Sequence, residues 1–455
     1  MTLSNTSSGA AYAAALRPEN GASSTLRDIR LAADVLIPSV RKPGVTPCKN
    51  QDQLRSFAMV KPVYLPRVID DRLARAVASV PIVIVDGPRA AGKTTSAQRL
   101  AGSVVALPDD LERLAADPAA FLGDLPAPVL IDEWQLAGTD LLWVLKRIVD
   151  ADPSPGRFIL TGSVEPATYG PTYPLTGRAA TVVMRPMSQV ELDGRGDQPT
   201  WVDQVVGGER PTSASGSANR FDLGRLAQTG FPAGRLMPDP GLLLDGYANA
   251  VAQRAGDEGR DATRLLNTLR VLATLEGQAV PDQRVWTAAG IDRVTWKAYE
   301  DLLGRAHITA SSPSFATNRL KRLTEYPKRF LADTALSMRL ASISPSGEPA
   351  VLGPYVESFV MQQLRPQVDR VGGAISHLRT GSSAQEVDVV IDVGGVVFAI
   401  EVKSSASPVR KDARHLDWLR DRLDDRFAAG FVVHTGGDAF PLGDRIWALP
   451  INALC

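Results

Sequence analysis

Short apolar runs, each closed by polar or turn residues, recur through the N-terminal half of the chain. They read "PIVIV", "APVLIDEW", "GRFILTGS" and "AATVVMRPMS" in chain order. Strands buried on both faces produce such continuous runs, because neither face meets water. Helical patterns lie between them, for example from Thr94 to Ala101 and from Asp140 to Asp150. The alternation predicts an α/β fold with a parallel sheet covered by helices on both sides.

The pattern changes after the fourth run. Residues 194–219 are rich in Gly, Ser and Pro and predict a loop or linker. "TRLLNTLRVLATLEG" then has helical spacing, and the next segment predicts two short helices around Gly290-Ile291 followed by a strand, which is typical of a winged-helix unit. From about Gly353 a helix, several short strands and a helix near Asp412 to Leu423 predict a second, smaller α/β segment that ends in "GFVVHT".

These patterns divide the chain into five expected parts. They are a loosely ordered tail (1–60), a parallel-sheet domain (61–193), a linker and helical lid (194–255), a winged-helix-like region (256–345) and a small α/β domain (346–455). The chain of 455 residues is long enough for several domains of ordinary size. Met59 lies just before the expected globular part and is an alternative translation start to Met1.

Charge and cysteine usage narrow the functional classes. The formal net charge is zero, so nucleic acid would have to be held by a local basic patch. The segment "NRLKRLTEYPKR" contains such a cluster; a solvated face is its simplest interpretation, and contact with DNA phosphates is the alternative. Its basic residues are Arg319, Lys321, Arg322, Lys328 and Arg329.

Disulfide frameworks and zinc sites are not expected, because the two cysteines, Cys48 and Cys455, have no spaced partners. The four histidines are scattered without ligand spacing. No apolar run has the length that a membrane span needs, and the N-terminus lacks the pattern of a signal peptide. We expect a cytoplasmic protein without a membrane partner.

The strongest motif follows the first apolar run. "GPRAAGKTT" fits the pattern G-x-x-x-x-G-K-[ST], in which glycines let successive backbone N–H groups face a phosphate. Lys93 is expected to reach the terminal phosphates, and Thr94 to place its hydroxyl on Mg²⁺. The predicted nucleotide-binding residues are Gly87, Pro88, Arg89, Ala90, Ala91, Gly92, Lys93, Thr94, Thr95 and Thr161. A Gly-rich turn without a ligand is the alternative.

Two further runs end in polar residues at the sheet edge where ligands bind. Asp132 is expected to hold Mg²⁺ and Glu133 to polarise the attacking water. Thr161 or Ser163 could contact the γ-phosphate or that water, or simply end a strand. Arg178 is a candidate arginine finger or sensor, with an ordinary surface arginine as the other interpretation.

Together these motifs resemble the prokaryotic AAA-type ATPases that carry a C-terminal domain of unknown function. The resemblance rests on "YLPRVIDDRL", "GPRAAGKTT", "LIDEWQ", "FILTGS" and "TGFP", and on "EVDVVIDVGGVVFAIEVKSS" near the end, and it covers about residue 61 onward. It implies ATP binding, hydrolysis, an AAA-like core and a winged-helix segment, but no cellular role.

A second candidate site lies in the C-terminal part. Glu401 and Lys403 share one face of a strand, and a hairpin at Gly394-Gly395 would bring Asp388 beside them. With Glu357 from the preceding helix, this set resembles the metal-binding core of restriction-endonuclease-like folds. The other interpretation is a surface ion pair.

The sequence therefore predicts a cytoplasmic Mg²⁺-dependent ATPase whose hydrolysis drives a conformational change in its C-terminal domains. Two alternatives stay open: an ATP-gated DNA nuclease, and a nucleotide-dependent switch that recruits a protein without turnover. A homo-oligomer is a further expectation.

Overall fold

A computed structural model describes residues 63–162, 173–209, 220–257, 259–315, 326–380 and 385–455. The predicted tail, Met59, Cys48 and Ser163 lie outside these residues, as do Arg319, Lys321 and Arg322 of the basic cluster. Across the described residues, no helix combines the length and the apolar character that crossing a bilayer requires.

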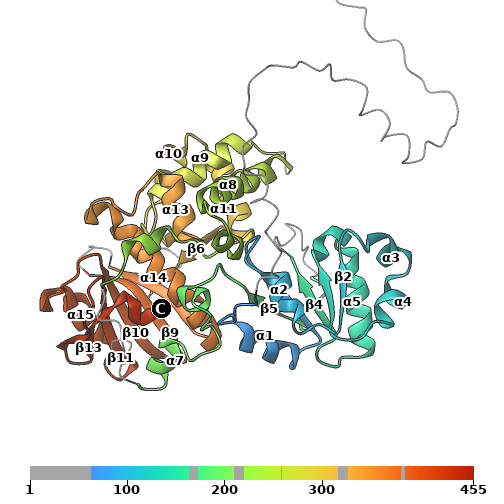
Figure 1. Ribbon diagram of the computed structural model, residues 1–455, viewed down its shortest axis with the longest axis horizontal. Coiled ribbons are helices and arrows are strands. Elements are labelled where there is room, and N and C mark those ends of the chain that lie inside the picture. Colours follow the sequence, from blue (N-terminus) through green and yellow to red (C-terminus); the bar gives the residue numbers. More distant parts are fainter. Residues whose placement is uncertain (1–62, 163–172, 210–219, 258, 316–325, 381–384) are drawn as a thin grey trace, which may run out of the picture. The chain divides into compact units, whose positions relative to one another are not determined.

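The N-terminal part is a five-stranded parallel sheet, as predicted (Figure 1). Its strand order is β2-β3-β4-β1-β5, so β1 lies between β4 and β5 and is buried along its whole length. The bounds are β1 Ile82–Asp86, β2 Ser103–Ala106, β3 Val129–Asp132, β4 Phe158–Thr161 and β5 Ala179–Val183. The apolar runs marked every strand except the edge strand β2, whose "SVVA" is short and half-exposed.

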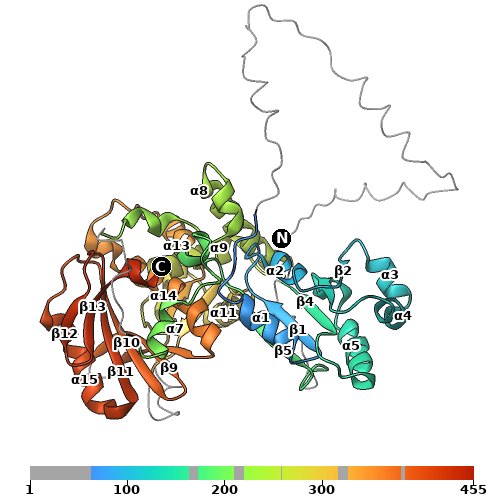
Figure 2. The ribbon, with the colours of Figure 1, turned by 60° about the horizontal axis from the view of Figure 1, so that its bottom comes forward.

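Helices cover both faces of this sheet, and β1 shows how the faces alternate. Ile82 and Ile84 pack toward α3 (Leu111–Ala116), α4 (Pro118–Gly123) and α5 (Asp140–Ala151). Val83 and Val85 pack toward α1 (Asp70–Val77) and α2 (Lys93–Gln98) on the other face (Figure 2). Period-2 alternation on a strand buried from both sides gives this division.

The predicted linker is only partly a loop. After α6 (Gln189–Leu192), the helix α7 (Trp201–Val206) begins inside it, and Trp201, Val202 and Val205 are buried in the core of the C-terminal part. The prediction of a loop or linker for residues 194–219 was therefore wrong for residues 201–206, where Thr200 and Asp203 form a capping box that starts a helix. Two 3₁₀ turns follow, η3 Leu223–Ala227 and η4 Pro232–Leu236, and residues 210–219 lie outside the described chain.

The middle of the chain is helical and ends in a small hairpin. Gly290, at a φ of 66°, separates α10 from α11, as the sequence predicts. Strands β6 and β7 pair antiparallel after α11. The bounds are α8 Pro240–Asp257, α9 Ala262–Thr274, α10 Asp282–Ala289, α11 Arg293–Arg305, β6 Thr309–Ser312, β7 Lys328–Leu331 and α13 Thr334–Ala341.

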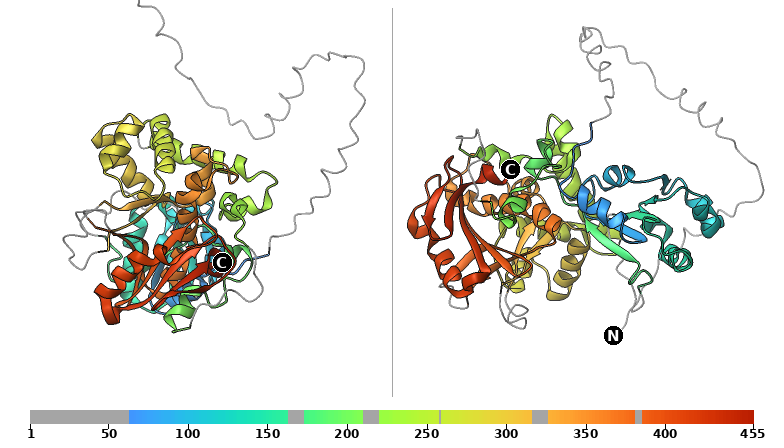
Figure 3. Two further views of the ribbon diagram at one scale, coloured as in Figure 1. Left: turned by 90° about the vertical axis from the view of Figure 1, so that its left-hand side faces the viewer. Right: turned by 90° about the horizontal axis from the view of Figure 1, so that it is seen from below.

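The C-terminal part, orange to red in Figure 3, contains a six-stranded sheet whose strand order is β12-β13-β11-β10-β9-β8. Strand β9 pairs antiparallel with β8 and β10, and β10 pairs parallel with β11. The long helix α14 packs on one face and α15 on the other. The bounds are α14 Pro349–Val371, β8 Ala374–Arg379, β9 Glu386–Val393, β10 Val396–Lys403, α15 Arg414–Leu423, β11 Phe427–His434, β12 Phe440–Gly443 and β13 Ile446–Pro450. Sequence reasoning missed β12 and β13.

Candidate functional site

The loop from Gly87 to Thr94, called here the P-loop, connects β1 to α2 and needs glycine at both ends. A Cβ on Gly87, at a φ of 145°, would lie 2.0 Å from the Met184 carbonyl oxygen. Gly92 has a φ of 94° and forms the N-cap of α2. Ala90, at 60°, also takes a left-handed conformation. The backbone of this loop therefore curls back on itself in the way that phosphate-binding loops do.

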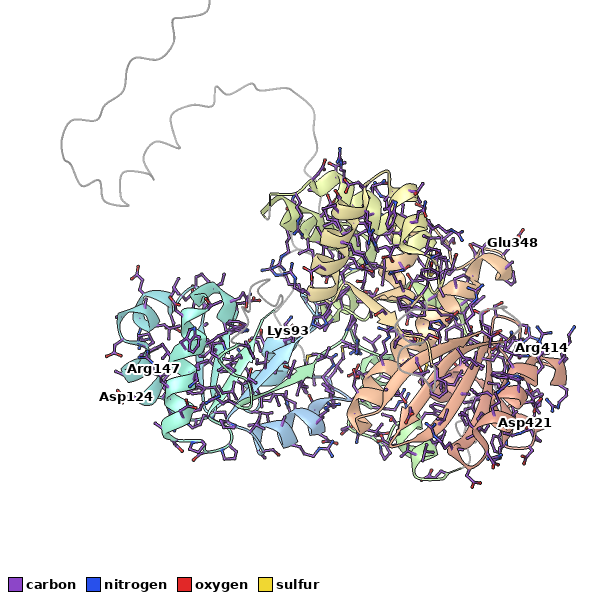
Figure 4. All side chains as sticks on the ribbon, turned by 180° about the vertical axis from the view of Figure 1, so that it is seen from behind. Lys93, Asp124, Arg147, Glu348, Arg414 and Asp421 are labelled. Atoms are coloured by element: carbon purple, nitrogen blue, oxygen red, sulfur yellow. The ribbon has the colours of Figure 1, made fainter. Side chains whose placement is uncertain are left out.

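Lys93 lies inside this curl. Its Nζ donates to the carbonyl oxygens of Gly87 and Pro88, both at 2.8 Å. Burial lowers the pKa of this ammonium to about 8, although the nearby charges of Glu133 and Asp86 act in the opposite direction. Figure 4 labels Lys93 at the start of α2. Among the other predicted loop residues Pro88 and Ala91 are buried, whereas Arg89, Ala90 and Thr95 are exposed.

Asp132 brings two predicted residues together at the carboxyl end of the sheet. Its Oδ1 accepts a hydrogen bond from Thr94 Oγ1 at 2.7 Å and another from the Thr161 hydroxyl. The second bond follows from the register, because Asp132 on β3 lies opposite Thr161 on β4. Thr161, predicted to contact a phosphate or water, is thus held by Asp132 and is fully buried.

The oxygens of Thr94 and Asp132 fit a hard cation such as Mg²⁺, which binds through one or two carboxylates and takes its other ligands from phosphates and water. Within the described ranges no cluster of three or more His, Cys, Asp or Glu side chains is arranged to hold a metal ion by itself. A Mg²⁺ ion here would depend on the nucleotide for the remaining oxygens.

Glu133 follows Asp132 in a left-handed conformation, at a φ of 53°. This turn ends β3 and begins the 3₁₀ helix η2 (Trp134–Ala137). The Glu133 carboxylate accepts a hydrogen bond from Gln135 Nε2. The negative charge of Glu133 favours the charged form of Lys93 and so opposes the effect of burial on the pKa of that lysine.

A buried ion pair that sequence reasoning missed braces the P-loop. Arg67 donates to Glu191 at 3.0 Å, to the carbonyl of Ala91 at 2.7 Å and to the carbonyl of Arg185 at 2.7 Å. Glu191 also accepts from the backbone N–H of Val68 at 2.9 Å. The pair joins the segment before α1, the P-loop and the segment after β5. In the sequence, the only indication of this pair is that Arg67 and Glu191 each lie next to apolar residues.

Arg178 lies far from this site within its own chain. It precedes β5, and its carbonyl accepts from the N–H of Ile82, where β1 begins. The P-loop follows the other end of β1, after Asp86. The Arg178 side chain pairs with Asp150 on α5. Since this is the opposite edge of the sheet, Arg178 does not reach the P-loop of its own chain; a finger for a neighbouring copy stays a prediction.

One histidine connects the sheet to the middle of the chain. His307 Nε2 lies 2.6 Å from Asp86 Oδ2, while Asp86 Oδ1 accepts from the N–H of Gly87 at 2.7 Å. His307 precedes β6 and has a φ of 54°. The sequence contains no indication of this contact, because His307 and Asp86 are 221 positions apart.

The predicted C-terminal residues do come together, and we call them the carboxylate cluster: Glu357, Asp388 and Glu401, with Lys403. Lys403 Nζ donates to Glu401 Oε1 at 2.8 Å, as their shared strand face predicts. Asp388 Oδ2 accepts from the N–H of Val402 at 2.9 Å. The cluster lines a polar cavity of about 760 Å³, and Arg284, Arg379 and Arg414 line the same cavity.

Lys328 joins the cluster, which corrects the prediction of a solvated basic face. Its Nζ donates to Glu357 Oε1 at 2.9 Å and to Asp388 Oδ1 at 2.8 Å, and its side chain is only 3% exposed. The neighbouring Arg329 is also mostly buried and pairs with Asp282 and Glu300. These two side chains are paired with carboxylates inside the protein, so for them neither the solvated face nor the alternative, contact with DNA phosphates, applies.

Burial and charge give the carboxylates of this cluster different pKa values. Burial, followed by the charge of Asp388, raises the pKa of Glu357 to about 8 and that of Glu401 to about 8. For Asp388, the ammonium of Lys328 and the hydrogen bonds it accepts outweigh burial and hold the pKa below its usual range. A proton retained on the cluster at neutral pH would compensate the excess of carboxylates over lysines.

Comparisons with known proteins agree with the N-terminal geometry. Residues 79–192 match the model of an AAA domain. Residues 245–347 match a domain of unknown function (DUF8612), and residues 352–454 match another (DUF4143). Uncharacterized proteins of Mycobacterium bovis (Mb2031c) and Mycobacterium tuberculosis (Rv2008c) are 27% identical over 399 residues, covering 84% of this chain and 83% of each relative.

Among solved structures, the Walker-type ATPase PABY2304 of Pyrococcus abyssi is similar at a TM-score of 0.37 and 16% identity, over 60% of this chain and 94% of that one. Protein VC1899 of Vibrio cholerae gives a TM-score of 0.18 and 12% identity, over 82% and 95% of the two chains. The AAA match and the P-loop geometry together support an AAA-type P-loop ATPase domain, for which ATP is the implied ligand.

Proposed function

We propose that the protein binds ATP with Mg²⁺ at the P-loop and hydrolyses it. One observation carries the proposal. The hydroxyl of Thr94 and the carboxylate of Asp132 come from separate elements and meet at 2.7 Å beside a loop whose lysine points inward. A Gly-rich turn without a ligand would have no reason to bring these three groups together.

Phosphate oxygens would take the place that the Gly87 and Pro88 carbonyls have around Lys93. The ammonium then offsets the negative charge of the terminal phosphates, and the backbone N–H groups of the loop donate to them. Arg67 donates to the Ala91 carbonyl and so stabilises the curl of the loop.

Thr94 and Asp132 are the residues that would hold Mg²⁺, which neutralises charge on the phosphates when bound. Thr161 orients the Asp132 carboxylate through its hydrogen bond. Glu133 is the group that accepts a proton from the attacking water, because it is the next carboxylate at the same sheet edge.

The other parts of the proposal rest on topology. Residues 61–193 form the ATPase domain, 194–255 the linker and lid, 256–345 a winged-helix-like region and 346–455 a nuclease-like domain. Three helices followed by the β6–β7 hairpin support the winged-helix arrangement. The pairing of β8, β9, β10 and β11 after α14 supports a restriction-endonuclease-like arrangement. Hydrolysis would act on these parts through contacts such as Asp86 with His307.

The two alternative functions, an ATP-gated nuclease and a nucleotide-dependent switch, differ from the proposed ATPase in what each would require. An ATP-gated nuclease would need a metal in the carboxylate cluster, where Lys328 lies. A switch without turnover would bind ATP tightly and release no phosphate. DNA and a second copy of the chain stay predicted partners.

The test is phosphate release with ATP and Mg²⁺, with and without DNA. Glu133→Gln should lower the rate by about 10²-fold or more while ATP still binds, because it removes only the proton acceptor. Lys93→Ala should abolish ATP binding itself. Glu112→Gln on α3, an exposed glutamate away from the sheet edge, is the matched control and should change neither quantity.

Phosphate release that survives Glu133→Gln at the wild-type rate would contradict the hydrolytic role. Tight ATP binding without release in the wild type, even with DNA, would leave the switch as the function.

A further inference from the structure

The carboxylate cluster differs in its central cation from the metal sites of the restriction-endonuclease-like folds that its residues resemble. In restriction-endonuclease-like proteins the corresponding acids hold divalent metal ions. Here the position between Glu357 and Asp388 is taken by a side chain of the same molecule. We propose that the C-terminal cluster is a metal-free site whose central cation is the ammonium of Lys328.

The available oxygens support this inference. Asp388 Oδ1 and Glu357 Oε1 both accept from Lys328 Nζ, and Asp388 Oδ2 accepts from the N–H of Val402. Glu401 Oε1 accepts from Lys403. Glu401 Oε2 is buried and has no hydrogen-bond partner among the described residues. A divalent cation at this point would need the facing oxygens Glu357 Oε1 and Asp388 Oδ1, and both are already bonded to the ammonium of Lys328.

Lys328 cannot withdraw as a surface lysine could. It begins β7, where it lies opposite Ser312 of β6, and it forms a further bridge to Ala279. On the next residue, the carbonyl of Arg329 accepts from the N–H of Gly277 at 2.8 Å. Two neighbouring segments therefore hold the backbone of Lys328, and its side chain is only 3% exposed, so the protein encloses the ammonium between its two carboxylate partners.

Charge explains why the cluster needs this lysine. Without Lys328, the carboxylates of Glu357 and Asp388 would face each other inside the protein with no cation between them. The same two acids would then have free oxygens directed at one point, which is how a metal site is built. Removing the ammonium should therefore create the metal site that the fold otherwise has.

This assignment gives the cluster a role other than hydrolysis. Lys328 belongs to the β6–β7 hairpin, whereas Glu357 lies on α14 and Asp388 on β9. The ion pairs fasten the hairpin to the C-terminal sheet. The inference concerns a site separate from the P-loop and holds whether or not ATP is hydrolysed.

The experiment is a titration of the full chain with Mn²⁺, followed by electron paramagnetic resonance. All samples carry Asp132→Asn, so that the P-loop contributes no ion. The wild-type cluster should bind no Mn²⁺ that depends on Asp388. Binding that disappears in Asp388→Asn would overturn the inference, and this comparison needs no change at Lys328.

Lys328→Ala should raise Mn²⁺ affinity by at least about tenfold, and Asp388→Asn added to it should remove the gain. Lys403→Ala is the matched control, because it frees oxygens on Glu401 alone and should create no site. A folded Lys328→Ala protein that binds Mn²⁺ no better than the wild type would also overturn the inference.

Discussion

At the scale of single residues, Lys93 couples the predicted nucleotide site to pH. Its ammonium is buried among carbonyl oxygens, and burial lowers its pKa to about 8. Triphosphate oxygens beside it would favour the charged form and raise that pKa again. The bound protein therefore holds more protons than the free protein near pH 8, which links ATP binding to proton uptake.

We expect ATP affinity to fall as pH rises through about 8, because the free lysine then loses the proton that the bound form keeps. Isothermal titration calorimetry at that pH, in two buffers with different ionisation enthalpies, measures the proton uptake directly. Lys146→Ala on α5, a partly exposed lysine paired with Asp150, should leave the uptake unchanged. Equal heats in the two buffers would show that Lys93 is already fully charged before ATP binds.

Residue patterns predicted the nucleotide site more completely than the carboxylate cluster. Gly87, Lys93, Thr94 and Asp132 could be found because the motif fixes their spacing and the strands fix their edge. Lys328 could not, since it reaches Asp388 across 60 positions and belongs to a separate hairpin. Its local neighbours are basic and polar, so sequence alone favoured an exposed face.

At the scale of secondary-structure elements, the β1–P-loop–α2 unit depends on close contact with the end of β5. Gly87 lies against the Met184 carbonyl, just beyond β5, and no Cβ fits there. Met184 N in turn donates to the carbonyl of Asp86 at 2.7 Å. The shape of the loop is therefore set by a neighbouring strand as well as by its own glycines.

Gly87→Ala should abolish ATP binding and destabilise the protein by several kcal/mol, since backbone must move to admit the methyl group. Gly246→Ala inside α8 is the matched control. A Cβ there meets nothing within 4 Å, so the change should stabilise by about 0.5–1 kcal/mol. Thermal melting and ATP titration of both variants check this, and a Gly87→Ala protein with wild-type affinity would contradict it.

Elements that are buried on both faces were the easiest to predict. The buried strands β1, β3 and β4 gave apolar runs. The edge strand β5 was also found, from its run "AATVV", although it is largely half-exposed. The helices α9, α10 and α11 gave helical spacing, with Gly290 between the last two. The edge strands β2 and β12 have four residues each and are half-exposed, so they carry little pattern. α7 was missed because its six residues lie among Gly, Ser and Pro.

At the scale of the whole described body, α14 contacts both the carboxylate cluster and the segment that follows β5. Its early turns carry Glu357, and Asp369 near its end pairs with Arg185 at 2.7 Å. Gln363 accepts from the backbone N–H of Gln189 at 2.6 Å. The distance from Glu357 to Asp369 along the helix is roughly 18 Å at 1.5 Å per residue. One helix thus connects the segment after β5 with the carboxylate cluster.

If ATP acts on the C-terminal part through this helix, adding ATP should change amide hydrogen exchange along α14. Asp369→Asn should reduce that change, because it weakens the pair with Arg185. Asp421→Asn on α15 removes an exposed pair with Arg420 and should have no effect. Exchange along α14 that is unaltered by ATP in the wild type would show that the helix does not transmit binding.

The lysine at the centre of the carboxylate cluster has a consequence for the cell. The ammonium of Lys328 is part of the polypeptide, so each carboxylate cluster receives its cation when the chain is translated. The cell therefore needs no transporter, chaperone or magnesium reserve to fill this site. The C-terminal fold should then persist when chelators strip divalent ions from the solution, while the nucleotide site loses its ion. Depletion of magnesium in the cell would therefore affect the nucleotide site at the P-loop and leave the carboxylate cluster unchanged.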